Sequence, residues 1–159
     1  MKTSSLSPPL RHRVGFTLVE IMVVVVIIGL LAAMGIPALQ RVQRRSQNSR
    51  FVSDLRVFAQ AFETYALENG SWPPNVGAGV VPAGLSSALQ VSVWTAPTVL
   101  KGRWNYDRNL FGVAVAVSLS GSSVTDAQMQ EIDAMIDDGD LTAGNFQKTS
   151  GRFMFILEQ

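Results

Sequence analysis

Cysteine is absent from this chain of 159 residues, and histidine occurs once, at His12. The absence of cysteine excludes disulfides, thiolate zinc sites and cysteine nucleophiles. The scarcity of histidine excludes Ser-His-Asp catalysis and histidine-based metal sites from the rest of the chain. Chemistry carried by carboxylates or lysine alone remains open, so the composition disfavours an enzyme without excluding one.

Acidic residues are missing from the first fifteen positions, which carry Lys2, Arg11 and Arg13. The whole chain has a formal charge of +1, so residues 16–159 taken together are slightly acidic. Bulk charge therefore gives no reason to expect a nucleic-acid partner.

Charge is also missing from the long apolar run at residues 21–39. A helix needs about 20 apolar residues to cross a membrane, and this run is long enough. A cleaved secretory signal has a shorter apolar stretch, of about 7–15 residues, although residues 31–40 could imitate its cleavage site. A plain single-pass anchor explains the length of the run, but it does not explain Gly15, Phe16 and Glu20 in front of it.

The hexapeptide GFTLVE, Gly15 to Glu20, resembles the processing signature of type IV pilins and type II secretion pseudopilins. That signature is a basic leader ending in glycine, then phenylalanine, then glutamate four residues later and a long apolar run. In this family a prepilin peptidase in the membrane cuts after the glycine, on the cytoplasmic side, and methylates the new N-terminal residue. The resemblance thus implies cleavage between Gly15 and Phe16 and N-methylation of Phe16.

The resemblance also implies partners and a location. Copies of this chain and related pilins or pseudopilins would pack their apolar helices into a filament at an inner-membrane assembly platform. The precursor would be a single-pass protein of the bacterial inner membrane with its C-terminal domain outside the cytoplasm, and the filament would be periplasmic or extracellular. Five arginines follow the apolar run and favour the opposite orientation under the positive-inside rule, but other signals override such a charge bias and we follow the motif.

Glu20 needs a partner, because an unpaired carboxylate in lipid is costly. Cleavage would create an ammonium group at Phe16, four residues before Glu20, and a pair within one helix is the simplest arrangement. The resemblance implies instead that the amine of an adjacent subunit binds Glu20 and sets the register of the filament.

Pro37 lies inside the helical run, where its ring conflicts with the carbonyl of Ala33, so a kink or a local opening is expected. The resemblance implies that the segment before such a proline loses helix in the assembled filament. It therefore gives Pro37, together with Phe16 and Glu20, a role in assembly.

Beyond the apolar run, the helix becomes amphipathic. An aromatic stripe at spacings of four and three predicts a face packed on a small domain rather than a ligand site; its members are Phe51, Leu55, Phe58, Phe62 and Tyr65. The helix is expected to end near Glu68, because Gly70 suits the C-terminal position and Pro73-Pro74 cannot continue it.

A cluster of arginines occupies the first part of this amphipathic half, and its members are Arg41, Arg44, Arg45, Arg50 and Arg56. The favoured interpretation is a solvated or headgroup-facing collar just outside the membrane. Pairing with acids of neighbouring subunits is the second interpretation. Nucleic-acid binding is the third, since no nucleic-acid-binding motif accompanies these arginines.

These features divide the chain into a leader at 1–15, an apolar half-helix at 16–40, an amphipathic half-helix at 41–69 and a C-terminal domain at 70–159. After a loop, that domain is expected to contain a short helix near 125–138 and several strands, at 91–94, 102–107, 112–120 and 152–158, with a turn at 107–109. In 112–120, valines and a leucine alternate with alanines and serines, which predicts a strand buried on one face. Thr125 and Gln128 have capping-box spacing at the start of the short helix, and Gly139 suits its end. The predicted fold class is α+β, a long helix whose amphipathic half packs on a small antiparallel sheet, which is also the pilin architecture.

Three carboxylates stand close together in the sequence, at Asp137, Asp138 and Asp140. Together with backbone carbonyls they could hold Ca²⁺, and major pseudopilins bind calcium in their C-terminal loops. The spacing does not match the calcium loop of helix–loop–helix proteins, and a solvated loop is the simpler interpretation. No other cofactor is expected.

The leading hypothesis is therefore a structural, non-catalytic subunit of a type IV pilus-like or type II secretion pseudopilus filament. The alternative is a single-pass, membrane-anchored binding module that does not polymerise. Some pilins close a C-terminal loop with a disulfide, so the lack of cysteine favours a pseudopilin.

Overall fold

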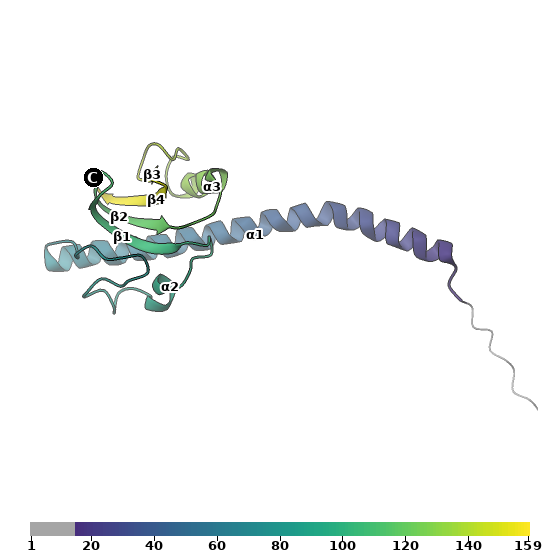
Figure 1. The fold of residues 1–159 in the computed structure, drawn as a ribbon, viewed down its shortest axis with the longest axis horizontal. Helices are drawn as coiled ribbons and strands as arrows, with labels where there is room; N and C mark the ends of the chain where they lie inside the picture. Colours follow the sequence, from purple (N-terminus) through teal and green to yellow (C-terminus); the bar gives the residue numbers. More distant parts are fainter. Residues whose placement is uncertain (1–14) are drawn as a thin grey trace, which may run out of the picture. The chain divides into compact units, whose positions relative to one another are not determined.

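The computed structural model describes residues 15–159, and a single long helix dominates it (Figure 1). This helix, α1, runs from Leu18 to Asn69 and has 52 residues, which corresponds to roughly 78 Å. The chain forms two compact units that divide between Arg41 and Val42.

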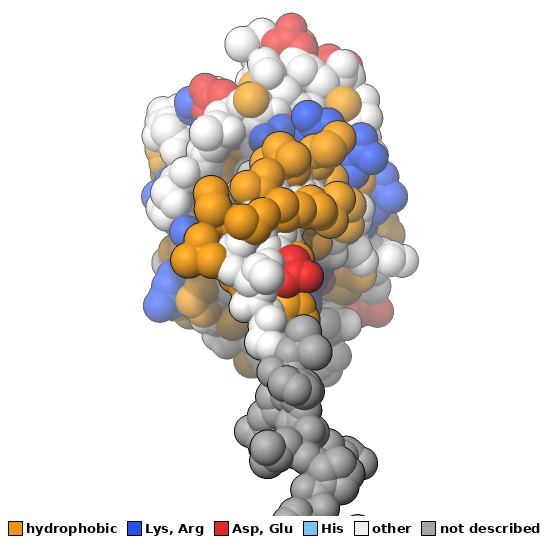
Figure 2. Space-filling model, turned by 90° about the vertical axis from the view of Figure 1, so that its right-hand side faces the viewer, with side chains coloured by type: hydrophobic (Ala, Val, Ile, Leu, Met, Phe, Trp, Pro, Cys, Tyr) orange, Lys and Arg blue, Asp and Glu red, His pale blue; other side chains and the backbone are white. Residues whose placement is uncertain are grey.

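The described part of the first unit is the N-terminal stretch of α1. It is long and apolar enough to cross a membrane, and none of its most apolar window is buried within the protein. Hydrophobic side chains accordingly cover the surface of this stretch (Figure 2). A kink or a local opening was expected at Pro37, and the described helix continues through it without a local opening. A proline removes only one hydrogen bond, and the bonds of the neighbouring turns hold the helix together.

The second unit packs the C-terminal half of α1 against a four-stranded antiparallel sheet. The strands lie in the order β1-β2-β4-β3, so β1 and β3 are the two edges. The remaining elements are, in chain order, α2 (Val91–Thr95), β1 (Arg103–Leu110), β2 (Val113–Ser120), α3 (Asp126–Ile136), β3 (Phe146–Thr149) and β4 (Arg152–Glu158). This arrangement confirms the predicted α+β class.

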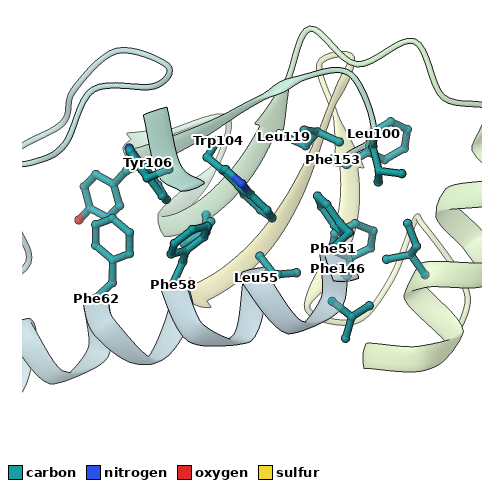
Figure 3. Close-up of a cluster of buried hydrophobic side chains, with 14 of the residues drawn as sticks. Phe51, Leu55, Phe58, Phe62, Leu100, Trp104, Tyr106, Leu119, Phe146 and Phe153 are labelled. Atoms are coloured by element: carbon teal, nitrogen blue, oxygen red, sulfur yellow. The ribbon is translucent and has the colours of Figure 1, made fainter. Parts of the chain in front are cut away.

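Aromatic side chains form the centre of the core (Figure 3). Phe51 stacks on Trp104 with ring centroids 4.8 Å apart, and Phe62 stacks on Tyr106 at 4.5 Å. Phe58 lies between them and meets Trp104 edge-on at 5.1 Å. The predicted stripe of α1 is therefore confirmed as a core face. Helix α1 ends as expected, with Gly70 at φ 66°.

Two predictions about the sheet are wrong in detail, and one short strand was not predicted. Residues 91–94, predicted to be a strand, lie in helix α2, where buried Trp94 donates to the carbonyl of Val80 at 2.8 Å. Strand β1 continues to Leu110, so the turn is Phe111-Gly112 rather than 107–109. Strand β3 was not predicted, since it is only four residues long and has little apolar alternation.

Strand β2 also differs from the prediction, because it is buried on both faces. Ala116 and Ser118 point away from α1, yet they are 0% and 1% exposed. Ser118 donates to the carboxylate of buried Asp107, and Arg152 donates to the same carboxylate at 3.0 Å. These polar contacts let side chains of the neighbouring strands cover the outer face of the sheet.

Helix α3 begins as predicted, with Thr125 as its N-cap accepting a hydrogen bond from the N–H of Gln128. It ends at Ile136, two residues earlier than expected, because Asp137 leaves the helical conformation. The sequence between α3 and β3, residues 137–145, forms a loop that carries the three predicted acids.

Candidate functional site

The predicted cleavage site lies just before α1. Gly15 and Phe16 are in non-helical backbone, and the side chain of Phe16 is exposed. A Cβ built on Gly15 would meet no atom within 4 Å, so packing within the protein does not require glycine there. The basic residues of the leader lie outside the described residues.

Glu20 caps the start of its own helix. Its Oε2 accepts hydrogen bonds from the backbone N–H and the hydroxyl of Thr17, at 2.9 and 2.8 Å. The N–H of Glu20 in turn donates to the Thr17 hydroxyl at 3.2 Å. This reciprocal arrangement is a capping box, with Thr17 as N-cap and Glu20 at the third helical position. The sequence analysis missed it, although the spacing Thr-x-x-Glu is its ordinary signal.

The capping box leaves part of the carboxylate free. Both contacts from Thr17 use Oε2, and Oε1 accepts no hydrogen bond from residues 15–159. In the uncleaved chain, Phe16 has an amide nitrogen and offers no charge. Glu20 can therefore cap its helix through one oxygen and still offer the other to an ammonium group.

All five arginines of the predicted collar are exposed, and two of them also make contacts within the domain. Arg44 forms a two-pronged contact with Glu131 of α3, and its Nε lies 3.0 Å from Oε2. Asn48, which is 2% exposed, donates to Glu131 at 3.0 Å and accepts from Gln128 at 2.8 Å. Arg56 donates to the carbonyl of Met135 at 3.1 Å. Two of the five arginines thus hold α3 against α1.

The acidic residues after α3 form a cluster, but its members differ from the predicted trio. Ligand oxygens of Asp133, Asp137 and Asp138 lie within 4.8 Å of one another. Asp140 stays outside this group and accepts from the N–H and hydroxyl of Thr142, at 3.0 and 2.7 Å. Those bonds, the hydroxyl first, lower the pKa of Asp140. Sequence reasoning missed Asp133, although it lies four residues before Asp137 and hence one helical turn away.

Asp133 is the unusual member of this cluster. Its side chain is fully buried, and neither carboxylate oxygen has a hydrogen-bond partner among the described residues. Burial, followed by the charges of Asp138, Asp137 and Asp140, raises the pKa of Asp133 to about 6, although the nearby backbone N–H of Gly139 lowers it in part. A buried carboxylate without a partner is costly, and a bound cation would remove that cost.

The cluster fits a calcium ion. Ca²⁺ binds oxygens at about 2.3–2.6 Å, so two of its ligands can be up to about 5 Å apart, as these carboxylates are. Asp137 is held in place by the N–H groups of Asn145 and Phe146. Gly144, at φ 69°, lies so close to Asp137 that any Cβ would overlap its carboxylate.

Comparisons with known proteins agree with these observations at the N-terminus and in the fold. Residues 11–36 match the family model described as the prokaryotic N-terminal methylation motif. The type II secretion system core protein G of Aeromonas hydrophila is 38% identical over 63 residues, which are 40% of this chain and 44% of that protein. A type IV major pilin, PilE1 of Neisseria gonorrhoeae, is 31% identical over 111 residues, or 69% of this chain and 54% of the pilin. The chain thus spans only about half the length of these relatives.

A solved structure shares the fold. The major type IV pilin PilA1 of Clostridium difficile matches with a TM-score of 0.50 and 13% identity, over 75% of this chain and 98% of that one. The likeness in sequence thus includes the N-terminal motif, and the likeness in fold extends over three quarters of the chain. The chain carries the prepilin-type N-terminal methylation motif on a pilin fold, and the proteins that it resembles are type IV pilins and type II secretion pseudopilins.

Proposed function

We propose that this chain is a structural subunit of a type IV pilus-like or type II secretion pseudopilus filament. A prepilin peptidase removes residues 1–15, Phe16 is N-methylated, and the mature chain assembles through α1 at an inner-membrane platform. The C-terminal domain lies outside the cytoplasm. The observation that carries the proposal is Glu20, a carboxylate four residues after Phe16 and at the head of a long apolar stretch, whose Oε1 accepts no hydrogen bond from the described residues.

The pairing of Glu20 explains how the binding of an incoming subunit is coupled to its register in the filament. A charge is costly in lipid unless it meets an opposite charge, so each incoming subunit is stable only where its carboxylate reaches an amine. We propose that this amine is the methylated Phe16 of an adjacent copy. Pro37 contributes by weakening the helix of the same segment, which lets it adapt to its neighbours.

Substitution of Glu20 tests the proposal in the full chain. Glu20→Ala is expected to be cleaved after Gly15 and methylated, as mass spectrometry of the N-terminus reports, yet to be absent from the filament fraction. Thr17→Ala is the matched control, because it removes the capping box and retains the carboxylate; it is expected to assemble. Normal assembly of Glu20→Ala would contradict the proposed pair between subunits. A mature protein that begins at Met1 would support the non-polymerising membrane anchor instead.

A finer proposal concerns the acidic cluster. We propose that Asp133, Asp137 and Asp138 hold Ca²⁺ outside the cytoplasm. The buried, unpartnered carboxylate of Asp133 supports this proposal, because calcium would supply the positive charge that the protein does not.

A further inference from the structure

A basic depression lies at one edge of the sheet, where β1 begins. It has a volume of about 540 Å³ and is lined by Thr98, Lys101, Arg103 and Ser120, together with small residues of the adjoining loops. No acid lines it, and neither Lys101 nor Arg103 forms an ion pair with any residue that the structure describes. Two cations therefore face solvent without a counter-ion.

The loop that carries Lys101 is fixed in place. The N–H of Thr98 donates to the carbonyl of Gly102 at 2.8 Å, and the Thr98 hydroxyl accepts from the N–H groups of Leu100 and Gly102 at 3.2 Å. Gly102 packs so tightly on β2 that a Cβ there would lie 2.6 Å from the side chain of Leu119. Because its oxygen already accepts two bonds, the Thr98 hydroxyl has its proton left to donate. The depression is thus a preformed group of donors that suits an anion.

The opposite edge of the sheet carries the opposite charge. The loop from Asp137 to Asp140 has three carboxylates in four residues and leads into β3, the edge strand farthest from β1. Three strand spacings separate the two edges, or about 14 Å, so the loop cannot fold back into its own depression. Each copy therefore has a positive edge and a negative edge.

Surfaces of this kind favour one mode of association. A symmetric dimer joined edge to edge would place like charge against like charge, whereas a head-to-tail contact joins the depression of one copy to the acidic loop of the next. A head-to-tail contact that does not close into a ring repeats as a helical filament. We propose that the Asp137–Asp140 loop of one copy docks into the basic depression of a neighbouring copy, an inference that rests on the proposed filament function. A calcium ion in the loop is compatible with this contact. The carboxylates of Asp133 and the three loop acids carry more negative charge than one Ca²⁺ neutralises, so the loop stays negative.

Cysteine cross-linking tests this contact in the full chain, which has no cysteine of its own. Ser120→Cys places a thiol in the depression and Ala143→Cys places one on the exposed acidic loop, and both leave every charge intact. Filaments that contain both variants, made as two separate chains, are expected to give disulfide-linked dimers on mild oxidation. Ser53→Cys, on the exposed surface of α1, is the matched control for Ser120→Cys and is expected to give none with Ala143→Cys.

Charge exchange supplies an independent measurement. Lys101→Glu and Asp140→Lys, the latter outside the proposed calcium cluster, should each lower incorporation into filaments by about fivefold or more, because each places like charges together. The two changes in one chain should restore most of the incorporation. Filaments of normal yield without the Ser120–Ala143 dimer, or a double variant no better than the weaker single one, would overturn the docking contact and leave the filament function standing. If the parent chain forms no filaments, both the docking contact and the proposed filament function are overturned.

Discussion

At the scale of single residues, the sequence shows which groups carry charge but not which of them the fold brings together. Glu20 was expected to need a partner, and its capping contact with Thr17 follows from a spacing that the sequence displays. Asp133 is different, because it looked like one more polar position beside the apolar stripe of α3. Its burial depends on how α3 packs on the rest of the domain, and that packing involves residues about 80 positions away along the chain.

Gly144 offers a test of how tightly the acidic loop is built. Gly144→Ala is expected to lower the free energy of unfolding of residues 42–159 by more than Gly121→Ala does. Both glycines have positive φ, 69° and 70°, so each substitution costs about 1 kcal/mol in backbone strain. Only the Cβ at Gly144 also overlaps the carboxylate of Asp137, whereas Gly121 has open space. If urea denaturation shows that both variants lose the same free energy of unfolding, the acidic loop moves aside to accommodate the new Cβ.

The effect of replacing Asp133 on the melting temperature should depend on whether calcium is present. In EDTA, Asp133→Asn is expected to raise the melting temperature, because it removes a buried charge that repels Asp137 and Asp138. Millimolar Ca²⁺ should raise the melting temperature of the parent but not of this variant. Asp140→Asn is the control, and it should keep most of the response because Asp140 lies outside the cluster. An unchanged parent melting curve on adding Ca²⁺ would favour a solvated loop.

At the scale of elements, long hydrophobic patterns in the sequence predict the core face of a helix or strand correctly, whereas short patterns are ambiguous. The aromatic stripe of α1 and the alternation of β2 extend over many residues, so the core face of each was predictable. The five residues of α2 are rich in valine and favour a strand by propensity, but the burial of Trp94 and its bond to Val80 decide the helix. The hairpin turn was misplaced because Asp107 and Asn109 are typical turn residues. The actual turn has positive φ at both Phe111 and Gly112, as expected for a two-residue type I′ turn.

The attachment of α3 to α1 depends more on a buried amide than on an exposed ion pair. Asn48→Ala is expected to lower the free energy of unfolding by about 1–3 kcal/mol, because it removes two hydrogen bonds from a buried position. Arg44→Ala should cost less than about 1 kcal/mol, since the Arg44–Glu131 pair is nearly half exposed. Chemical denaturation of both variants measures the difference. A larger loss for Arg44→Ala would show that the ion pair dominates.

At the scale of the whole molecule, the chain joins two parts that are stabilised by different surroundings. The described residues before Val42 bury nothing within the protein, so their apolar surface needs lipid or other subunits. The part that follows has a continuous core from α1 to β4. The fold class was predictable because both halves of the helix leave their own pattern in the sequence. The charged edges of the sheet were not predictable, because they depend on the strand order.

This difference leads to a last prediction, about residues 42–159 produced alone. The truncated chain keeps the aromatic face of α1, its bonds to α3 and all four strands. It lacks the apolar stretch that would otherwise drive aggregation in water. We therefore expect a soluble, cooperatively folding protein whose circular dichroism shows both helix and strand. It should not polymerise, because Phe16 and Glu20 are gone and the contact between charged edges alone is weak at physiological salt. Aggregation or a non-cooperative transition would show that the core needs the N-terminal stretch, and spontaneous filaments of this truncated chain would show that Glu20 is dispensable for assembly.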